Sequence, residues 1–528
     1  MKTVLLADKL PEECRRILEA GGLTVVNRPG LSEDELKQAV RGVSGIVCRS
    51  GVRITCEVLQ AADVLEAICR AGVGVDNVDV AAASRRGVAV MNTPGGNAVS
   101  TAEHTFALLL GLARKIGPAY ISMRSGAWNR SQFLGSQLAG STLGVIGFGR
   151  VGQEVSRRAI AFGMRVCVHD PFVGPDTAAK LGVQLVDELP DLLRESDYVT
   201  LHVPENDKTR GMIGAEQVAM MKPGACIINC ARGSVLDQAT VLAALNDGRL
   251  GGLAVDVYPT EPPESFEFVQ NDKVLATPHL GASTHAAQLA VAVQAAEQMV
   301  DALQRRHYRN AVNIGTVAPE EMKVLRPYCD LAVRIGKLVA QISTGRPERL
   351  EVSCRGEIAE GSTDPIVSYG AMGVMQGSLG DDVNIVSAPH LAAERRVRIT
   401  GSATVGLEAG FANLVEISLV TDAGTFEAAG TVFAPELARI VRIDGFMVEL
   451  APVGDVLILH GNDVPGVIGK VGAILGAGGV NIARMTVGRH DVGGKTLLAL
   501  NVDTPCTPAC IDRLVALPEV DAARSVHL

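Results

Sequence analysis

Aromatic side chains are scarce in this chain of 528 residues: they make up 3%, with a single tryptophan, Trp128. A protein that stacks bases or sugar rings needs more of them, so that class of binding protein is disfavoured. Concentrated positive charge is also missing, because 49 basic residues face 58 acidic ones and the net charge is −9. A nucleic-acid surface needs clustered cations, so we expect no nucleic-acid partner.

Long apolar runs are absent as well. The longest, at residues 106–113, is about half of what a membrane-spanning helix needs. The apolar run at residues 4–7 is too short for a signal peptide and is typical of a first strand. We therefore expect no membrane partner and a cytoplasmic protein.

The 11 cysteines are an odd number, scattered through apolar segments. This distribution favours reduced thiols buried in a core over a disulfide framework. Two pairs have four-residue spacing, Cys226 with Cys230 and Cys506 with Cys510. Neither has nearby histidines that would complete a zinc ligand set, so we expect no metal site.

What the chain has in quantity is small and aliphatic residues. Hydrophobic residues reach 47% and glycine numbers 57. This composition supplies a packed core and suits closely packed parallel α/β layers. At roughly 100–200 residues per domain, the length suggests three or four domains.

Short apolar segments alternate with helical patterns, which predicts βαβ units and parallel sheets. The first expected strands are 4–7, 45–48, 65–69 and 88–91. A second series of expected strands is 142–146, 165–169, 198–202, 225–229 and 253–256. Long helices at 97–117 and 282–306 would cross between the two series.

This order predicts an α/β protein with two doubly wound parallel-sheet domains. A flavodoxin-like domain would comprise residues 1–96 and 284–312, and a Rossmann-like domain at 97–283 would be inserted in it. Residues 313–453 carry more β-type segments and predict an α+β domain between these and the C-terminal part. Residues 454–528 show the β-α-β-β-α-β order of a ferredoxin-like domain.

A glycine-rich turn follows the expected strand 142–146. Gly147, Gly149 and Gly152 have the GxGxxG spacing between a strand and a helix. The first glycine allows a tight turn, the second lets the backbone approach a pyrophosphate, and the third lets helix and strand pack closely. Asp170 ends the next strand, where a carboxylate binds a ribose diol and repels a 2′-phosphate. NAD is therefore the expected cofactor.

Three polar residues follow later strands: Arg232, Glu261 and His279. Ligands in open α/β sheets bind beyond the carboxyl ends of strands, so these side chains can converge. Oxidation of a 2-hydroxy acid needs a guanidinium to bind the carboxylate, a base to take the hydroxyl proton, and a carboxylate to orient that base. Arg232, His279 and Glu261 can supply these in that order. Taken singly, each also fits a structural role in a salt bridge or a turn.

The stretch from about Val4 to Asn313 resembles the D-isomer-specific 2-hydroxy-acid dehydrogenases. The motifs that carry this resemblance are residues 147–152, 229–233, 256–263 and 278–284. Residues 70–79 and 92–97 narrow it to the branch that oxidises 3-phospho-D-glycerate. The C-terminal pair of extra domains is similar to those of the long-form enzymes, and residues 454–528 resemble an ACT domain.

The resemblance implies NAD-dependent oxidation of 3-phospho-D-glycerate to 3-phosphooxypyruvate, the first step of phosphorylated L-serine synthesis. It places Arg232, Glu261 and His279 at the family's catalytic positions. With the glycines of the turn, the positions that bind cofactor are Gly147, Gly149, Arg150, Val151, Gly152, Asp170, Cys230, Ala231, Asp256 and Gly281. The loops that face the substrate contain Arg49, Ser50, Gly74 and Asn97.

A phosphorylated substrate needs cations in an otherwise acidic protein. The substrate carries about three negative charges, so binding requires positive charge in the cleft beyond Arg232. Arg49 and Arg70 each end an expected strand on the side of the first domain that faces the cleft. We expect both to bind substrate; ordinary surface salt bridges are the alternative.

The ACT resemblance implies regulation. In related enzymes such domains pair edge to edge and bind serine, so L-serine is the expected effector, with Asp463 and Asn481 at contacting positions. Relatives often have a polar or aromatic side chain where this chain has Gly461, so the alternative is a dimerisation module in which Asp463 only caps a helix. The family is usually tetrameric, which implies a homo-oligomer.

Two other functions stay open. A dinucleotide-sensing binding protein or corepressor can share the fold and retain the catalytic set, although such relatives lack an ACT domain. Another enzyme of the same class could reduce glyoxylate, hydroxypyruvate or 2-oxoglutarate. The C-terminal module favours an enzyme of amino-acid metabolism.

Overall fold

The N-terminal sheet is parallel, with the strand order β2-β1-β3-β4-β5 that is typical of flavodoxin-like domains. Its strands are β1 (Thr3–Leu6), β2 (Thr24–Asn27), β3 (Gly45–Cys48), β4 (Ala67–Arg70) and β5 (Ala89–Met91). Helices α1 (Glu12–Ala20) and α12 (His285–Arg305) cover one face, and α2 (Glu33–Ala39), α3 (Cys56–Ala61) and α4 (Val80–Arg85) cover the other. Because both faces are covered, strands such as β3 are apolar and fully buried.

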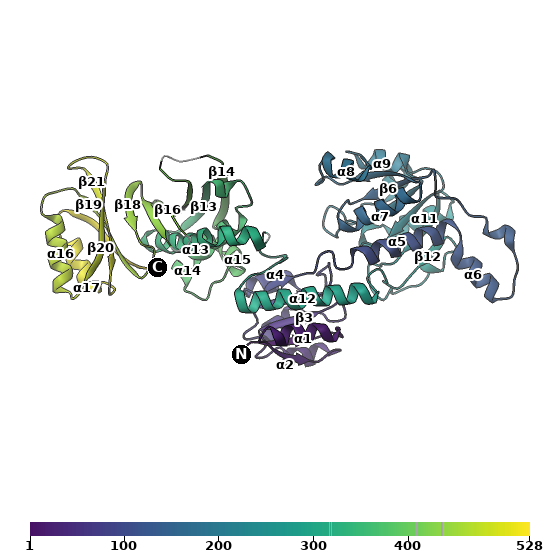
Figure 1. Ribbon diagram of the computed structural model, residues 1–528, viewed down its shortest axis with the longest axis horizontal. Coiled ribbons are helices and arrows are strands. Elements are labelled where there is room, and N and C mark those ends of the chain that lie inside the picture. The colour runs from purple at the N-terminus through teal and green to yellow at the C-terminus, as the bar shows by residue number, and fades with distance from the viewer. Residues whose placement is uncertain (316, 318, 407–409, 435–436) are drawn as a thin grey trace.

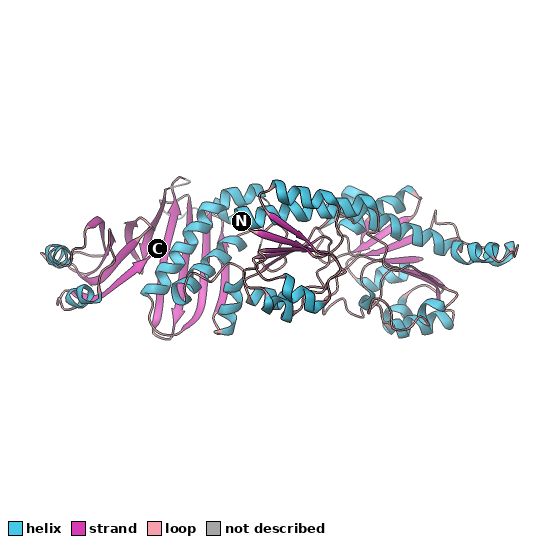
Figure 2. Cartoon of the chain, turned by 90° about the horizontal axis from the view of Figure 1, so that it is seen from below, coloured by secondary structure: helices cyan, strands magenta, loops and turns pink. Residues whose placement is uncertain are grey.

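The second sheet is also parallel and has the doubly wound order β12-β11-β10-β9-β6-β7-β8. Its strands are β6 (Thr142–Ile146), β7 (Arg165–His169), β8 (Gln184–Leu185), β9 (Tyr198–Leu201), β10 (Ala225–Asn229), β11 (Leu250–Val255) and β12 (Val274–Ala276). Its helices are α5 (Ala98–Ala113), α7 (Arg150–Ala161), α8 (Pro175–Leu181), α9 (Leu189–Glu195), α10 (Ala215–Met220) and α11 (Gln238–Asn246). Helices lie above and below the strands of both parallel sheets in Figure 2.

Two long helices connect the parallel sheets, as the sequence predicts. Helix α5 leads into the second sheet and α12 returns to the first (Figure 1). The single helix expected over 97–117 is wrong only at its C-terminal end, because α5 stops at Ala113. The chain turns at Lys115, whose φ of 53° lies in the left-handed region, and a separate helix α6 (Ile116–Arg124) projects from the body.

The third sheet is mixed, with the order β14-β13-β15-β16-β17-β18. Its strands are β13 (Pro347–Gly356), β14 (Arg398–Thr404), β15 (Asn413–Thr421), β16 (Gly424–Val432), β17 (Ala438–Ile443) and β18 (Phe446–Leu450). Its helices are α13 (Pro319–Ile342), α14 (Asp364–Leu379) and α15 (Ser387–Glu394). The structure describes residues 1–315, 317, 319–406, 410–434 and 437–528.

The C-terminal sheet is antiparallel. Its strands have the ferredoxin-like order β20-β21-β19-β22. Its elements are β19 (Asp455–Asn462), α16 (Val467–Ala477), β20 (Ile482–Arg489), β21 (Lys495–Val502), α17 (Pro508–Val515) and β22 (Val520–His527). This sheet shares a hydrophobic core with the third sheet and lies at the far end of the molecule from β6 (Figure 1). No helix in the described ranges is long and apolar enough to cross a membrane.

Candidate active site

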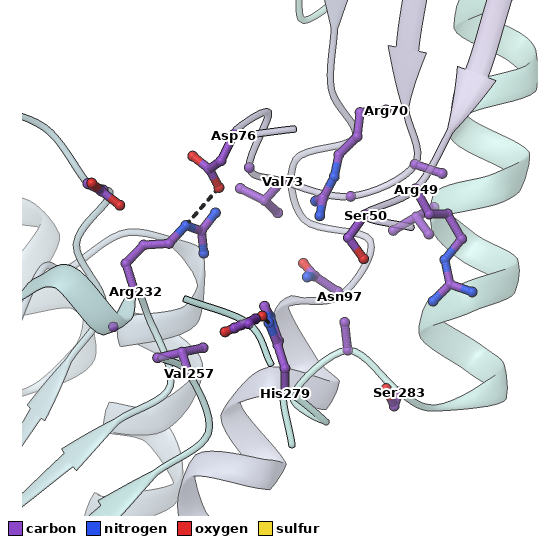
Figure 3. A pocket seen from close by; sticks show the side chains of 18 of the residues that line it. Arg49, Ser50, Arg70, Val73, Asp76, Asn97, Arg232, Val257, His279 and Ser283 are labelled. Atoms are coloured by element: carbon purple, nitrogen blue, oxygen red, sulfur yellow. Dashed lines mark hydrogen bonds and ion pairs between the residues drawn. The ribbon is translucent and has the colours of Figure 1, made fainter. Parts of the chain in front are cut away.

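A cavity of about 310 Å³ lies between the two parallel sheets. Arg49, Ser50 and Arg70 reach it from the first sheet, and Arg232 and His279 reach it from the second (Figure 3). The first group follows or ends strands β3 and β4, and the second follows β10 and β12. The cavity thus forms where the carboxyl ends of strands from both sheets face each other, as open α/β sheets predict.

His279 and Glu261 form a short hydrogen bond, with 2.6 Å between Nδ1 of the histidine and Oε2 of the glutamate. An ionised carboxylate can only accept, so Nδ1 carries a proton, and in the neutral imidazole Nε2 is then the nitrogen with a lone pair. Burial raises the pKa of Glu261, but the hydrogen bonds from His279 and from the Tyr258 N–H outweigh burial and lower it. Glu261 is therefore an anion that fixes one tautomer of His279.

The loop that carries His279 is held by a buried carboxylate. Asp256 is 1% exposed and accepts the backbone N–H groups of Leu280 and Gly281, each at 2.7 Å. Thr277 Oγ1 donates to the same side chain at 2.6 Å. His279 has φ 55°, a left-handed conformation that costs about 1–3 kcal/mol in a non-glycine residue. The anchored loop maintains that conformation.

Arg232 lies close to the first sheet's loops. Its Nε is 3.1 Å from Oδ2 of Asp76, and its Nη1 donates to the carbonyl of Ala231 at 2.7 Å. A Cβ built on Gly74 would lie only 1.9 Å from Arg232 Nη2, so a larger residue at this position would displace the Arg232 guanidinium. The Arg232 side chain is 28% exposed and lines the cavity.

The remaining substrate candidates leave polar groups unsatisfied. Arg70 Nε and Asn97 Oδ1 are buried and have no hydrogen-bond partner among the described residues. Burial lowers the pKa of Arg70, and the nearby Arg232 and Arg49 lower it further. Three guanidinium groups thus face one cavity whose described acidic lining residues are Asp76, Glu205 and Glu261. The unpartnered Arg70 Nε and Asn97 Oδ1 at the cavity wall suit an anionic ligand with a hydroxyl donor.

The glycine-rich turn has the geometry that a dinucleotide requires. Gly147 has φ 91°, and a Cβ on it would meet the carbonyl oxygen of His202 at 2.6 Å. A Cβ on Gly152 would meet the carbonyl oxygen of Gly147 at 2.2 Å, whereas Gly149 has open space around it. Helix α7 begins at Arg150, so its N-terminus faces that space. The residues present therefore fit a bound pyrophosphate.

Asp170 is positioned beside this turn. Its Oδ2 accepts the Phe148 N–H at 2.8 Å and its Oδ1 accepts the Phe172 N–H at 2.9 Å. The carboxylate therefore lies against the turn itself, where a ribose next to the pyrophosphate would lie. Arg150 donates to the carbonyl of Pro94 and so connects the start of α7 to the first domain's last loop.

The other predicted cofactor positions surround the same edge. Cys230 and Ala231 are buried directly after β10, and Gly281 approaches Asp256 and Thr101. Burial raises the pKa of the Cys230 thiol to about 12, so this cysteine is a neutral wall and not a nucleophile. Val151 packs on the core of the second sheet.

Comparison with known proteins agrees with this geometry. A family model described as the NAD binding domain of D-isomer specific 2-hydroxyacid dehydrogenases matches residues 106–281, and one described as the D-3-phosphoglycerate dehydrogenase intervening domain matches 324–444. The D-3-phosphoglycerate dehydrogenase of Methanocaldococcus jannaschii is 38% identical over the whole of both chains, and that of Bacillus subtilis is 36% identical over the same extent. The chain belongs to the D-3-phosphoglycerate dehydrogenase family.

Solved structures support the same assignment. The NAD⁺-bound 3-phosphoglycerate dehydrogenase of Entamoeba histolytica is 26% identical with a TM-score of 0.52, and covers 60% of this chain and 99% of its own. A glyoxylate reductase from Paecilomyes thermophila is 28% identical with a TM-score of 0.55, and covers 61% of this chain and 99% of its own. As a member of the D-3-phosphoglycerate dehydrogenase family, this chain is an NAD-dependent oxidoreductase.

The predicted effector residues do not meet within one chain. Asp463 follows β19 and accepts from Arg489 at 2.7 Å, whereas Asn481 precedes β20 and donates to Asp503 at 2.7 Å. The pairing of β19 and β20 with β21 places them at opposite ends of the sheet. Asp463 as a helix cap is wrong, because α16 begins at Val467 after Gly466 and Asp463 bonds elsewhere.

Sequence reasoning missed several residues at the site. Asp76 and Ser234 line the cavity, and the Ser234 hydroxyl is buried without a partner in the described chain. Asn77 donates to the carbonyls of Arg49 and Val52 and so shapes the loop after β3. Among these residues, only Asp76 and Asn77 could have been found from the sequence, since both lie in the motif 70–79.

Proposed function

We propose that this chain oxidises 3-phospho-D-glycerate to 3-phosphooxypyruvate with NAD, in the phosphorylated route to L-serine. The observation that carries the proposal is the convergence of the His279–Glu261 pair and three arginines on one cavity. The names and full-length identity of the relatives support the same substrate.

His279 is the proposed acid/base. Its Nε2 is free to accept the proton of the substrate's C2 hydroxyl, because Nδ1 is held by Glu261. As His279 becomes imidazolium, the adjacent carboxylate stabilises the charge. The nicotinamide, when bound, supplies the acceptor for the C2 hydride. In the reverse direction the same imidazolium returns its proton to the carbonyl oxygen.

Arg232 is proposed to bind the substrate carboxylate. Its two-pronged guanidinium matches a carboxylate and orients C2 relative to His279. Arg49 and Arg70 line the opposite side of the cavity and are proposed to bind the phosphate. With Ser50, Gly74 and Asn97 they would set the distance from phosphate to C2, which favours phosphorylated substrates over glyoxylate.

A substrate panel tests this proposal. The purified chain with NAD is assayed by the absorbance of the reduced cofactor against 3-phospho-D-glycerate, D-glycerate and D-lactate. The reverse reaction is assayed with 3-phosphooxypyruvate, hydroxypyruvate, glyoxylate and 2-oxoglutarate. The highest kcat/KM on the phosphorylated pair is expected. A preference for an unphosphorylated acid would reassign the substrate, and no turnover with cofactor binding retained would favour the sensor.

L-serine feedback is the proposed regulation, and a homo-oligomer is the proposed assembly. Since Asp463 and Asn481 lie at opposite ends of one C-terminal sheet, an effector that touches both needs two chains. The projecting helix α6 also exposes Ile116, Tyr120 and Ile121, which suits burial against a second copy. Titration of L-serine during turnover, with mass measured in solution, tests both; an active monomer unaffected by millimolar serine would reject them.

A further inference from the structure

His104 lies on the inner side of α5 and contacts the support of the catalytic loop. Its Nε2 is 3.1 Å from Oδ1 of Asp256 and 3.0 Å from Oγ1 of Thr277. The side chain is 20% exposed. It is not among the described residues that line the cavity, so it does not meet the substrate directly.

The hydrogen bonds among His104, Asp256 and Thr277 determine which atoms donate. The carboxylate of Asp256 can only accept, and Thr277 Oγ1 has one proton, which it donates to Asp256 at 2.6 Å. Thr277 Oγ1 can therefore only accept from the histidine. Nε2 of His104 must carry a proton, shared between Thr277 and Asp256.

Asp256 depends on that donor. Burial raises its pKa, yet the hydrogen bonds from His104, Thr277 and the Leu280 N–H together lower it, so the residue is a buried anion. No lysine or arginine in the described ranges forms a salt bridge with it, and the side-chain nitrogen that contacts it is His104 Nε2, at 3.1 Å. Loss of the His104 donor would remove one of the interactions that offset burial, so the carboxylate would be less stable as an anion in its present position.

We propose that His104 is a positioning residue for the reaction, acting through Asp256 on the loop that carries His279. This inference rests on the function proposed above. Asp256 binds the N–H groups of Leu280 and Gly281, the two residues that follow His279. With Nε2–H in place, these bonds hold His279 in its left-handed conformation and at 2.6 Å from Glu261.

His104 lies on α5, a helix that also connects the two parallel sheets. Helix α5 starts at Ala98 after Asn97, which lines the cavity, and Ser100 bonds Thr284 at the start of α12 at 2.7 Å. The starts of α5 and α12, the two helices that connect the parallel sheets, therefore contact each other within two helical turns of His104. The geometry joins the crossing helix to the catalytic loop, so the loop is set relative to the first domain as well.

Three variants of His104 test the proposal. His104→Gln retains an N–H donor at the reach of Nε2, whereas His104→Met has similar length and no donor. His104→Asn is a polar control whose amide is too short. We expect His104→Met and His104→Asn to lower kcat by about 10–100-fold, as for a small displacement of a catalytic group. KM for 3-phospho-D-glycerate and the Kd for NAD should change little, and His104→Gln should restore most of kcat.

The decisive readouts are the kcat-against-KM split and the kinetic isotope effect with substrate deuterated at C2. Slower chemistry raises the observed isotope effect in His104→Met, whereas a loss of folded protein leaves it unchanged. Parental kcat in both His104→Met and His104→Asn would overturn the proposal, as would Gln behaving like Met. His279→Ala is assayed in parallel: if it retains full activity the proposed function fails, and if it alone is inactive only the role of His104 fails.

Discussion

The catalytic cleft and the C-terminal module differ in how they bring polar residues together. In the cleft, residues as far apart in sequence as Arg49 and His279 line one cavity, because carboxyl ends of parallel strands lie on one edge. In the C-terminal module, Asp463 and Asn481 are only 18 residues apart and lie at opposite ends of the sheet. The candidate residues of the cleft therefore meet within one chain, whereas the two proposed effector residues do not.

This comparison predicts that a substitution in one region has little effect on the other region. The third sheet lies between the C-terminal sheet and the two parallel sheets that enclose the cleft (Figure 1). Substitutions in the cleft should therefore remove catalysis without unfolding the C-terminal sheet. Substitutions in the C-terminal module should alter stability or serine response before they alter turnover.

The largest effect is expected for His279→Ala. Removal of the general base should lower kcat by about 10²–10⁴-fold while NAD binding is kept, because the cofactor turn lies on a different loop. His285→Ala, an exposed histidine six positions along, is the matched control. Steady-state kinetics and cofactor titration measure both, and an active His279→Ala variant would contradict the assignment.

Arg49→Ala should have a smaller and selective effect. Loss of a charge-assisted contact with the phosphate predicts about a 10–100-fold fall in kcat/KM for 3-phospho-D-glycerate. Activity on D-glycerate should change little, since that substrate has no phosphate. Arg53→Ala, an exposed arginine on the same loop, serves as the control. An equal loss on both substrates would show that Arg49 only supports the fold.

Asp170→Ala tests the cofactor side of the cleft. The Kd for NAD should rise about 10-fold, and the preference for NAD over NADP should narrow because the carboxylate no longer repels a 2′-phosphate. Asp170→Asn separates charge from shape, since the amide oxygen can still accept the Phe148 N–H. Unchanged discrimination in both variants would argue against a ribose contact.

The cleft could be predicted from the sequence because its residues follow from rules that act along the chain. The GxGxxG spacing and the polar residues after β10 and β12 need only the order of strands and helices. His104 could not be predicted in this way. It lies 152 positions from Asp256, and nothing in its neighbours on α5 indicates a polar contact.

The same reasoning explains which elements were missed. Strand β2 (Thr24–Asn27) is a partly exposed edge strand, and its short, mixed sequence resembles a loop. Strand β13 of the third sheet was also missed, although its buried residues Leu350, Val352 and Cys354 alternate with more exposed ones. The long helix α13 of the same domain was missed as well. Tertiary packing decides these segments more than local preference does.

The smallest expected effect concerns Gly461. It follows an irregularity in the pairing of β19 with β22, and a Cβ there would lie 2.2 Å from the carbonyl oxygen of Glu519. The absence of a side chain is thus required by a close backbone approach, whatever the effector. Gly461→Ala should destabilise the C-terminal module by about 1–3 kcal/mol and leave kcat unchanged.

Gly469→Ala is the control for that change, because it lies on α16 with open space around its Cα. Alanine favours a helix, so this variant should be neutral or slightly stabilising. Calorimetry of the full chain with parallel assays separates the outcomes. If Gly461→Ala lowered kcat while the cleft variants also destabilised the C-terminal sheet, the two regions would be coupled in the resting protein.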